Sequence, residues 1–374
     1  MKDDMLLWDE TLFKDPEVFE LDYVPEHFYH REAQMKSLRF CVRPAIRGAR
    51  PVNALCMGPP GTGKTTAIIK LFEELEKHTR SVITVHINCQ IDGTRYSIFS
   101  RIYKKIFGVA PPSSGISFKR LFDKIANELA SREVVLIVAL DDVSYLFPEK
   151  EIDHILYTLL RSHESLPGFR AGVIAAHSEP TMKYILDPRV ESVFRPEEIM
   201  FPHYKRDEIF AILSRRAQLG FYPGVLSQEV LDVVVDLTAE SGGDLRVGID
   251  LLKRAGLEAE RRASRSISED DVRKAFGSSR FLHLEHAIRS LSSDERSLLR
   301  IIAEQPDGKA QSGELYSIYH EIAPAGYTKF YEILKRLEAL RLVETSFTGL
   351  GVKGRSRIIH LRYDPAEVLA RIER

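Results

Sequence analysis

The stretch NALCMGPPGTGKTTAIIKLF, residues 53–72, decides the fold, because it joins a short apolar run to a glycine-rich loop and then to residues with helical spacing. Gly58 to Thr65 match the pattern G-x-x-x-x-G-K-[ST] in the strand–loop–helix order that this pattern requires. The glycines let the backbone turn tightly and direct several N–H groups at phosphate oxygens, at the positive end of the following helix. The stretch therefore predicts a nucleotide phosphate-binding loop at the start of an α/β domain.

The motif also predicts separate roles for its residues. Lys64 is expected to reach the β- and γ-phosphates of bound ATP or ADP, and Thr65 is expected to place its hydroxyl on Mg²⁺. A glycine-rich loop that binds no ligand is disfavoured, since all three elements of the motif are present in order. The predicted nucleotide contacts in the loop are Pro60, Gly61, Thr62, Gly63, Lys64, Thr65 and Thr66.

A second apolar stretch, VVLIVALDD at residues 134–142, is typical of a central strand in a parallel sheet that is covered on both faces. In proteins with a P-loop, such a strand ends beside the loop and its first carboxylate holds Mg²⁺ through water, which fits Asp141. Asp142 follows at the position where a base would polarise the attacking water. Its short side chain limits its reach and predicts slow hydrolysis. Two solvated carboxylates at an exposed strand end are the alternative, which the complete P-loop disfavours.

Composition sets broad limits. A chain of 374 residues suggests two or three domains, and 44% hydrophobic with 29% charged residues indicates a globular protein. The formal net charge of −1 means that any basic surface must be local. The acidic start lacks a signal sequence, and no apolar run approaches the roughly 18 residues of a membrane span. Cys41, Cys56 and Cys89 lack metal-binding spacing, so reduced thiols and a cytoplasmic location are expected.

With these motifs placed, the chain resembles AAA+ ATPases, and more closely the archaeal replication initiators related to the eukaryotic origin recognition complex and its helicase-loading partner. The resemblance covers nearly the whole chain and rests on short stretches beyond the P-loop. They lie at residues 23–26, 31–32, 88–90, 186–190 (LDPRV), 216–226 (RAQLGFYPGVL) and 242–252 (GGDLRVGIDLL). The resemblance implies that Tyr23, Val24, Pro25 and Arg31 help to bind the adenine.

The same resemblance implies further catalytic residues. Arg246 matches the second sensor, a lid arginine that touches the γ-phosphate, and Arg189 matches an arginine that acts on a neighbouring subunit's nucleotide. The alternative for each of the two is that it is a surface arginine in a salt bridge, without a catalytic role. The first-sensor asparagine of the family falls on Ser178, with His177 as the adjacent alternative. Together with Asp142, these departures predict a site that holds nucleotide and turns it over slowly.

The order of apolar patterns predicts the domains. Alternating strands and helices over residues 52–201, with strands at 81–88 and 171–177, indicate a parallel sheet. Helical patterns follow at 205–276, where Ser268 would cap the last helix, and the resemblance makes them the lid. Three helices and a glycine-broken β segment then give the order of a winged helix. The predicted fold is therefore an α/β AAA+ P-loop core with a parallel sheet (1–202), a helical lid (203–282) and a C-terminal winged-helix domain (283–374).

The predicted winged helix carries the local positive charge. Residues 324–362 hold eight basic and three acidic residues, a net charge of +5. The third helix would direct Tyr327, Thr328 and Lys329 at base edges in the major groove. A hairpin would bring three more cations to phosphates or the minor groove, namely Lys353, Arg355 and Arg357. A winged helix that binds protein is the alternative.

A second candidate DNA contact lies in the ATPase core at residues 93–108, GTRYSIFSRIYKKIFG. Its apolar positions Ile98, Ile102 and Ile106 are expected to face the core. By resemblance it falls in the helical insertion through which initiators contact duplex DNA, although a plain amphipathic helix explains the pattern almost as well. The candidate cations are Arg95, Arg101, Lys104 and Lys105.

These observations and the resemblance lead to one functional hypothesis. The chain would be an ATP-binding initiator that recognises double-stranded DNA at replication origins and helps to recruit or load the replicative helicase, alongside paralogous initiators on the same DNA. Its expected location is the cytoplasm, on the nucleoid and away from membranes. An AAA+ remodelling ATPase, clamp-loader-like or a transposition helper, is the second hypothesis. A nucleotide switch without DNA is the third, and the +5 region disfavours it.

Overall fold

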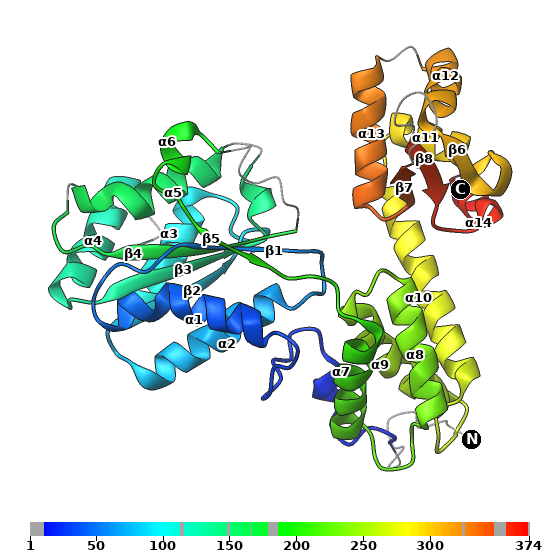
Figure 1. Ribbon diagram of the computed structural model, residues 1–374, viewed down its shortest axis with the longest axis horizontal. Coiled ribbons are helices and arrows are strands. Elements are labelled where there is room, and N and C mark those ends of the chain that lie inside the picture. The colour runs from blue at the N-terminus through cyan, green and yellow to red at the C-terminus, as the bar shows by residue number, and fades with distance from the viewer. Residues whose placement is uncertain are drawn as a thin grey trace. The chain divides into compact units, whose positions relative to one another are not determined.

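The computed structural model describes residues 11–112, 116–147, 150–164, 166–178, 186–323, 326–347 and 357–372 of the chain. The chain divides into two compact units, Met1–Val272 and Arg273–Arg374 (Figure 1). Each unit has its own hydrophobic core.

The first unit is built on five parallel strands. They are β1 (Ala54–Met57), β2 (Val82–Asn88), β3 (Val135–Asp141), β4 (Ala171–His177) and β5 (Glu197–Met200), in the order β2-β3-β4-β1-β5. Every residue of β3 and β4 is buried, as their near-continuous apolar sequences predict for strands covered on both faces. Because all five strands run the same way, the carboxyl ends of β1, β3 and β4 meet at one edge of the sheet.

Helices cover both faces of this sheet (Figure 1). α1 (Glu32–Ile46) and α2 (Lys64–His78) pack on one face, and α3 (Arg95–Phe107), α4 (Phe118–Ser131) and α5 (Glu151–Arg161) pack on the other. Alternate residues of β3 serve the two cores, since successive strand side chains point to opposite faces. Thr94 and Ser117 cap the first turns of α3 and α4 through their hydroxyls, which fixes where these helices begin.

The lid of the first unit is helical. It contains α7 (Arg206–Gly220), α8 (Gln228–Glu240) and α9 (Leu245–Arg261), after the single-turn helix α6 (Pro188–Glu191). The N-terminal segment packs here as well, because Phe13 pairs with Phe221 in an isolated bridge and the short helix η1 (Pro16–Phe19) adds Phe19 to the same aromatic cluster.

The second unit is the predicted winged helix. Its helices α11 (Ser293–Ala303), α12 (Ser312–Ile322) and α13 (Tyr327–Ala339) pack with a three-stranded antiparallel sheet of order β6-β8-β7. The sheet consists of β6 (Lys309–Gln311), β7 (Val343–Phe347) and β8 (Arg357–Leu361), and α14 (Pro365–Ile372) follows it. The predicted apolar face of α13 is confirmed, with Phe330, Ile333, Leu334 and Leu337 buried and Leu340 partly buried.

Two expectations need correction, and one strand was not predicted. The helix capped by Ser268 does not end near residue 276 but continues as α10 (Glu269–Arg289) into the second unit, because Gly277 alone does not break it. The strand at 134–142 ends at Asp141, since Asp142 takes a left-handed conformation (φ +56°) and a 3-10 helix, Val143–Leu146, follows. The sequence also gave no signal for β5, an edge strand that exposes three of its four residues. No helix in the described part of the chain is long and apolar enough to cross a membrane.

Candidate nucleotide-binding site

The P-loop connects the end of β1 to the first residue of α2, as the motif predicts. Two of its glycines cannot be replaced without strain. A Cβ atom on Gly58 (φ +155°) would lie 2.1 Å from the carbonyl oxygen of Phe201, and one on Gly61 (φ +71°) would lie 1.9 Å from Oδ1 of Asp244. The loop is therefore closely packed between the end of β5 and the start of α9.

The predicted phosphate and metal residues lie together at the carboxyl edge of the sheet. Thr65 Oγ1 donates to Asp141 Oδ2 at 2.7 Å, and Lys64 Nζ donates to the carbonyl oxygens of Gly58 and Pro59 at 2.6 and 2.9 Å. His86 of β2, which the sequence did not single out, has its Nε2 3.1 Å from the same Asp141 oxygen. The P-loop and the end of β3 therefore form one site, although β4 separates their strands.

The electrostatics of the two aspartates differ. Burial by itself would raise the pKa of Asp141, but the hydrogen bonds from His86 and Thr65 and the charge of Lys64 outweigh it and hold the pKa below its ordinary value. Burial and the charge of Asp141 raise the pKa of Asp142. The pKa of Lys64 is lowered, chiefly by burial. Asp141 is thus the carboxylate held ionised, ready to bind a cation, and Asp142 is the better proton acceptor.

The backbone conformation after Asp141 suits an aspartate. Asp142 has φ +56° and ψ +51°, in the left-handed region where Asp and Asn are enriched over other side chains. Its side chain is half-buried and lies within the electrostatic reach of Lys64 and Arg246. A longer carboxylate would extend further but would fit this backbone conformation less well.

Arg246 lies close enough to the site for its charge to act on both Lys64 and Asp142. Its guanidinium is paired with a buried carboxylate, since Nε and Nη2 donate to Oδ1 and Oδ2 of Asp244 at 3.0 and 2.9 Å. Asp244 also caps the first turn of α9 and is the residue that a Cβ on Gly61 would strike. One carboxylate thus links the predicted sensor arginine to the P-loop, a role that no sequence pattern indicates.

The other two predicted catalytic residues lie in different surroundings. Ser178 follows β4 directly, and the carbonyl oxygen of His177 accepts the N–H of Gly58 at 3.2 Å, so the end of β4 lies beside the start of the P-loop. His177 is buried edge-on against Phe147, with ring centroids 5.3 Å apart, whereas Ser178 is half-buried. Arg189 is 85% exposed on α6, with Nε 3.9 Å from Asp187 Oδ1. No described contact brings Arg189 to this chain's own P-loop.

The N-terminal segment braces the site. Arg31 is 2% exposed, and its guanidinium donates to the carbonyl oxygens of Thr62 (2.9 Å), His30 (2.8 Å) and Pro202 (2.7 Å) while it lies over the Tyr204 ring. These contacts use the guanidinium to join the P-loop to the start of the lid. Its predicted contact with adenine stays a prediction.

The remaining adenine candidates lie in the same segment. Tyr23 packs under the guanidinium of Arg216 of α7, and Val24 and Pro25 are half-buried beside it. Phe28 and Tyr204, which sequence reasoning missed, both lie close to Gly63. Chain segments this far apart in sequence leave no local pattern that could have identified them.

The donor set fits a magnesium nucleotide. Lys64 and the N–H groups around the start of α2 would hold phosphate oxygens, and the hydroxyl of Thr65 with the ionised Asp141 offers the oxygen ligands that Mg²⁺ prefers. The close packing around Gly58 and Gly61 means that only glycine fits at these two positions of the loop. When bound, the metal would supply charge neutralisation for the phosphates.

Most of the cations predicted to contact DNA on α3 make contacts within the protein. Ile98, Ile102 and Ile106 are buried, as expected. Among the cations, Arg101 Nε donates to Asp92 at 2.8 Å, and Lys105 Nζ donates to Glu76 at 2.8 Å. Arg95 lies over the Phe118 ring at 4.1 Å, which leaves Lys104 as an exposed cation outside these contacts.

The winged helix presents its predicted residues differently. Tyr327, Thr328 and Lys329 are all exposed in the first turn of α13. Arg357 of β8 lies over the ring of Tyr331 on α13 at 4.8 Å, and Lys335 lies near the same ring at 5.1 Å. Cations from the strand and the helix therefore share one surface. Lys353 and Arg355 lie outside the described residues.

Comparison with known proteins supports each part of this architecture. Residues 50–175 match the profile of the AAA domain, residues 210–277 match the Cdc6 AAA+ ATPase-type lid domain, and residues 287–371 match the CDC6 C-terminal winged helix domain. The first profile covers the P-loop and the end of β3, and the other two cover the lid helices and the winged helix.

Relatives match along nearly their whole length. The chain is 52% identical over 98% of its length to the ORC1-type DNA replication protein 2 of Methanosarcina acetivorans, of which it covers 97%. It is 50% identical to the ORC1-type DNA replication protein 3 of Haloarcula marismortui, with 99% of each chain covered.

Two solved structures share the fold. The Aeropyrum pernix ORC1 protein in complex with DNA is 28% identical, with a TM-score of 0.73 and coverage of 98% of this chain and 97% of that one. The Aeropyrum pernix ORC2 protein (ADPNP-ADP complexes) is 26% identical, with a TM-score of 0.73 and coverage of 97% and 98%. The resemblance stated from the sequence is confirmed, and the chain belongs to the family of ORC1-type DNA replication proteins.

Proposed function

We propose that this protein is an ATP-dependent DNA replication initiator that binds duplex DNA at origins through its winged helix. The main support for this proposal is the surface that α13 and β8 share, where Lys329 is exposed and Arg357 and Lys335 lie over the ring of Tyr331. The net charge of the chain is −1, so this positive charge is local. A rigid aromatic ring that holds two cations pre-arranges them for phosphate contacts. The relative solved in complex with DNA supports the same assignment.

Nucleotide binding and slow hydrolysis would act as the switch. Lys64, Thr65 and Asp141 would hold ATP or ADP with Mg²⁺, while Asp142 would accept the proton of the attacking water. Arg246 connects this site to the lid, because its partner Asp244 contacts the P-loop and starts α9. The relative solved as ADPNP-ADP complexes supports nucleotide binding.

The proposal extends to partners. Arg189 is the most exposed of the predicted catalytic side chains, which suits a role on the nucleotide of a neighbouring copy or paralogue. Recruitment of the replicative helicase completes the proposed role. A pull-down of purified helicase by the DNA-bound protein tests this step, and equal recovery without the protein would contradict it.

Duplex affinity, measured as a function of salt, tests the main proposal. The full chain is titrated against labelled origin duplex with ATP or ADP, and Lys329→Gln with Arg357→Gln is compared with a control pair, Lys309→Gln with Arg300→Gln, from exposed cations of the same unit. Each lost phosphate contact should reduce the salt slope by about 0.9. The first pair should therefore lose about 1.8, and the control pair should keep the wild-type slope. Duplex binding that is insensitive to salt, or equal for both pairs, would overturn the proposal.

A further inference from the structure

Helix α1 carries a narrow exposed stripe that no motif identified. Lys36, Phe40, Arg43 and the C-cap residue Arg47 are all exposed, and Phe40 is 64% exposed. Successive helical residues are rotated by about 100°, so these four positions fall within about 60° of one another. The stripe spans the twelve residues from Lys36 to Arg47, whose ends lie about 16 Å apart along the helix at 1.5 Å per residue.

The cations of the α1 stripe are not neutralised within the protein. In the described part of the chain, no ion pair or hydrogen bond joins the side chain of Lys36, Arg43 or Arg47 to another residue, whereas their neighbour Arg39 donates to Glu74 at 2.8 Å. The sequence contains no acidic residue from position 33 to position 72. This differs from α3, where Arg101 and Lys105 are both ion-paired.

The acidic residues on the elements that pack against α1 do not neutralise the cations of the stripe. On α2, Glu73 pairs with Lys70 and Glu74 pairs with Arg39. On β5, Glu197 and Glu198 are exposed at the edge of the sheet next to α1. The α1 stripe therefore combines three unpaired cations with an aromatic ring, and the exposed acids next to it are Glu197 and Glu198 of β5.

This combination suits one class of ligand. Cations attract phosphates, and an exposed aromatic ring offers a surface on which a nucleobase can stack. In a duplex the faces of the bases are covered by their neighbours, so a ring on a helix surface cannot stack on them without unstacking the duplex. A single strand presents both phosphates and base faces.

We propose that Lys36, Phe40, Arg43 and Arg47 form a single-stranded nucleic-acid contact on the ATPase unit, separate from the winged helix. The contact does not depend on the proposed duplex binding, because it uses residues of the first unit alone. It lies on the sheet face covered by α1 and α2, opposite the face that α3 covers.

The test uses the full chain and two triple variants of equal charge. Lys36→Gln with Arg43→Gln and Arg47→Gln removes the stripe, and Lys77→Gln with Arg80→Gln and Arg215→Gln removes exposed cations elsewhere in the first unit. Each protein is titrated with a labelled mixed-sequence single strand and with the corresponding duplex across a range of salt concentrations. All six side chains are exposed, so both triples should melt at the wild-type temperature.

The expected results separate the two surfaces. The stripe triple should reduce the single-strand salt slope by about 2, from about 0.7 per phosphate contact, while the control triple should leave it unchanged. Phe40→Ala should weaken single-strand binding about tenfold without changing the slope, and Phe40→Tyr should retain binding. Duplex affinity should be the same for all variants.

Two outcomes would overturn the inference. If the stripe triple binds the single strand as the control triple does, the α1 stripe is not a nucleic-acid contact. If single-strand and duplex binding fall together and Phe40→Ala is silent, the stripe attracts polyanions in general and the single-strand assignment is wrong. Neither result bears on the winged-helix substitutions, so a failure here is distinguishable from a failure of the proposed duplex binding.

Discussion

At the scale of single residues, Gly61 offers a sharp test of the P-loop geometry, because its backbone lies in the left-handed region and its missing Cβ leaves room for Asp244. Gly61→Ala should destabilise the protein by about 1 kcal/mol for the backbone and by a further amount for the clash, and should abolish nucleotide binding. Chemical denaturation and a fluorescent ATP analogue measure the two effects.

Gly108→Ala is the matched control. Gly108 has nearly the same φ (+75°), but a Cβ there meets nothing within 4 Å. It should show only the backbone cost of about 1 kcal/mol and bind nucleotide normally. Equal destabilisation by the two substitutions, with nucleotide binding intact in both, would contradict the packing of Asp244 against the loop.

Asp142 carries the prediction about hydrolysis. Asp142→Asn should reduce single-turnover ATP hydrolysis about 100-fold, since the amide cannot accept the proton of the attacking water. ATP affinity should change little, because Asn tolerates the left-handed backbone as Asp does. The wild-type rate should rise with pH through the raised pKa of Asp142 and then level off.

The shape of the pH profile gives the control. Only the ionised carboxylate accepts a proton, so activity is lost as pH falls through the pKa of Asp142, which burial raises above the ordinary aspartate value. In Asp142→Asn the residual rate should lose this step. Fast, repeated turnover by the wild-type protein, or an unchanged rate in the variant, would favour a remodelling ATPase over a slow switch.

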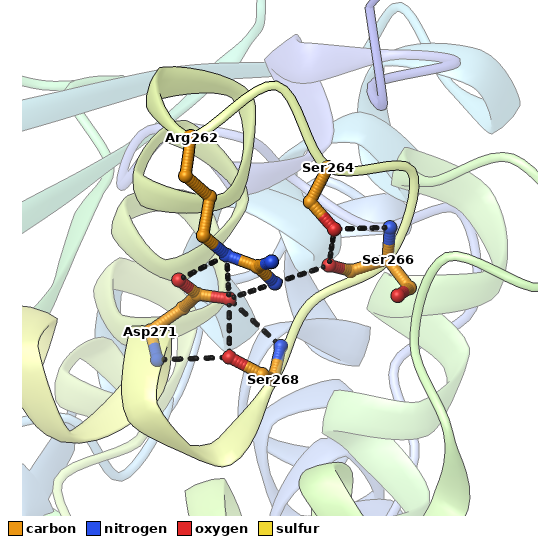
Figure 2. A network of polar contacts seen from close by, with 5 residues as sticks. All are labelled: Arg262, Ser264, Ser266, Ser268 and Asp271. Carbon is orange, nitrogen blue, oxygen red and sulfur yellow. Dashed lines mark hydrogen bonds and ion pairs between the residues drawn. The ribbon is translucent and has the colours of Figure 1, made fainter.

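At the scale of elements, a polar network fixes the start of α10 (Figure 2). The buried carboxylate of Asp271 accepts hydrogen bonds from Arg262 Nε at 2.9 Å and from the N–H and hydroxyl of Ser268 at 2.8 and 2.7 Å. Arg262 Nη2 also donates to the carbonyl oxygen of Ser266 at 2.8 Å, and Ser264 closes the turn between α9 and α10. The helix shared by the two units is thus anchored by one carboxylate.

Replacement of Asp271 by Asn should lower the free energy of unfolding by about 2 kcal/mol, because it leaves Arg262 without its anionic partner. Burial would raise the pKa of Asp271, but the hydrogen bonds from Arg262 and Ser268 outweigh it and lower the pKa. A lowered folded-state pKa means that the stabilisation is complete above the unfolded pKa of about 3.9 and is lost as pH falls through the folded value. Urea denaturation between pH 7 and pH 3 measures the difference.

The neighbouring exposed residue gives the comparison. Asp270→Asn removes the same charge from the first turn of α10 but no hydrogen bond of this network, so its effect should stay within about 0.5 kcal/mol. The gap between the two variants should be constant above about pH 4 and should close below it. A gap that widens as pH falls would mean that the folded-state pKa of Asp271 is raised and would contradict the network.

Elements with a strong local signal were the predictable ones. β3 and β4 are apolar at nearly every position because both faces are buried, and the apolar face of α13 repeats with helical spacing, so sequence alone located them. β5 and β6 are short and expose every second residue or more, and each is paired with one neighbouring strand. No local pattern records such pairing.

The residues of the candidate site also divide into those that sequence could locate and those that it could not. Lys64, Thr65 and Asp141 were predictable because motif spacing and strand ends place them, and their hydrogen bonds follow from the parallel sheet. His86, Asp244 and the bracing contacts of Arg31 depend on strand register and on how the lid meets the loop. Tertiary packing decides these contacts, so a single sequence carries no trace of them.

At the scale of the whole molecule, the three cysteines report on opening of the first unit. Cys41 on α1 and Cys56 on β1 belong to the core on one face of the sheet, and Cys89, after β2, belongs to the core on the other face. All three are 0% exposed. Burial raises the pKa of Cys41 to about 11 and of Cys89 to about 12, and raises that of Cys56 as well. Because the thiolate is the reacting species, both access and ionisation protect these thiols.

Labelling of the native protein at pH 8 with a thiol reagent should therefore be slow at all three positions and should proceed at one common rate, whereas in concentrated guanidinium all three thiols should react at once. Mg-ATP at 100 times its dissociation constant should slow native labelling about 100-fold, since only the folded first unit binds nucleotide. Lys64→Ala, which removes a phosphate contact, should label at the same rate with and without Mg-ATP. Fast labelling of a single cysteine would reveal local opening of one face of the sheet, and an ATP effect that survives in Lys64→Ala would show that the nucleotide acts from a site other than the P-loop.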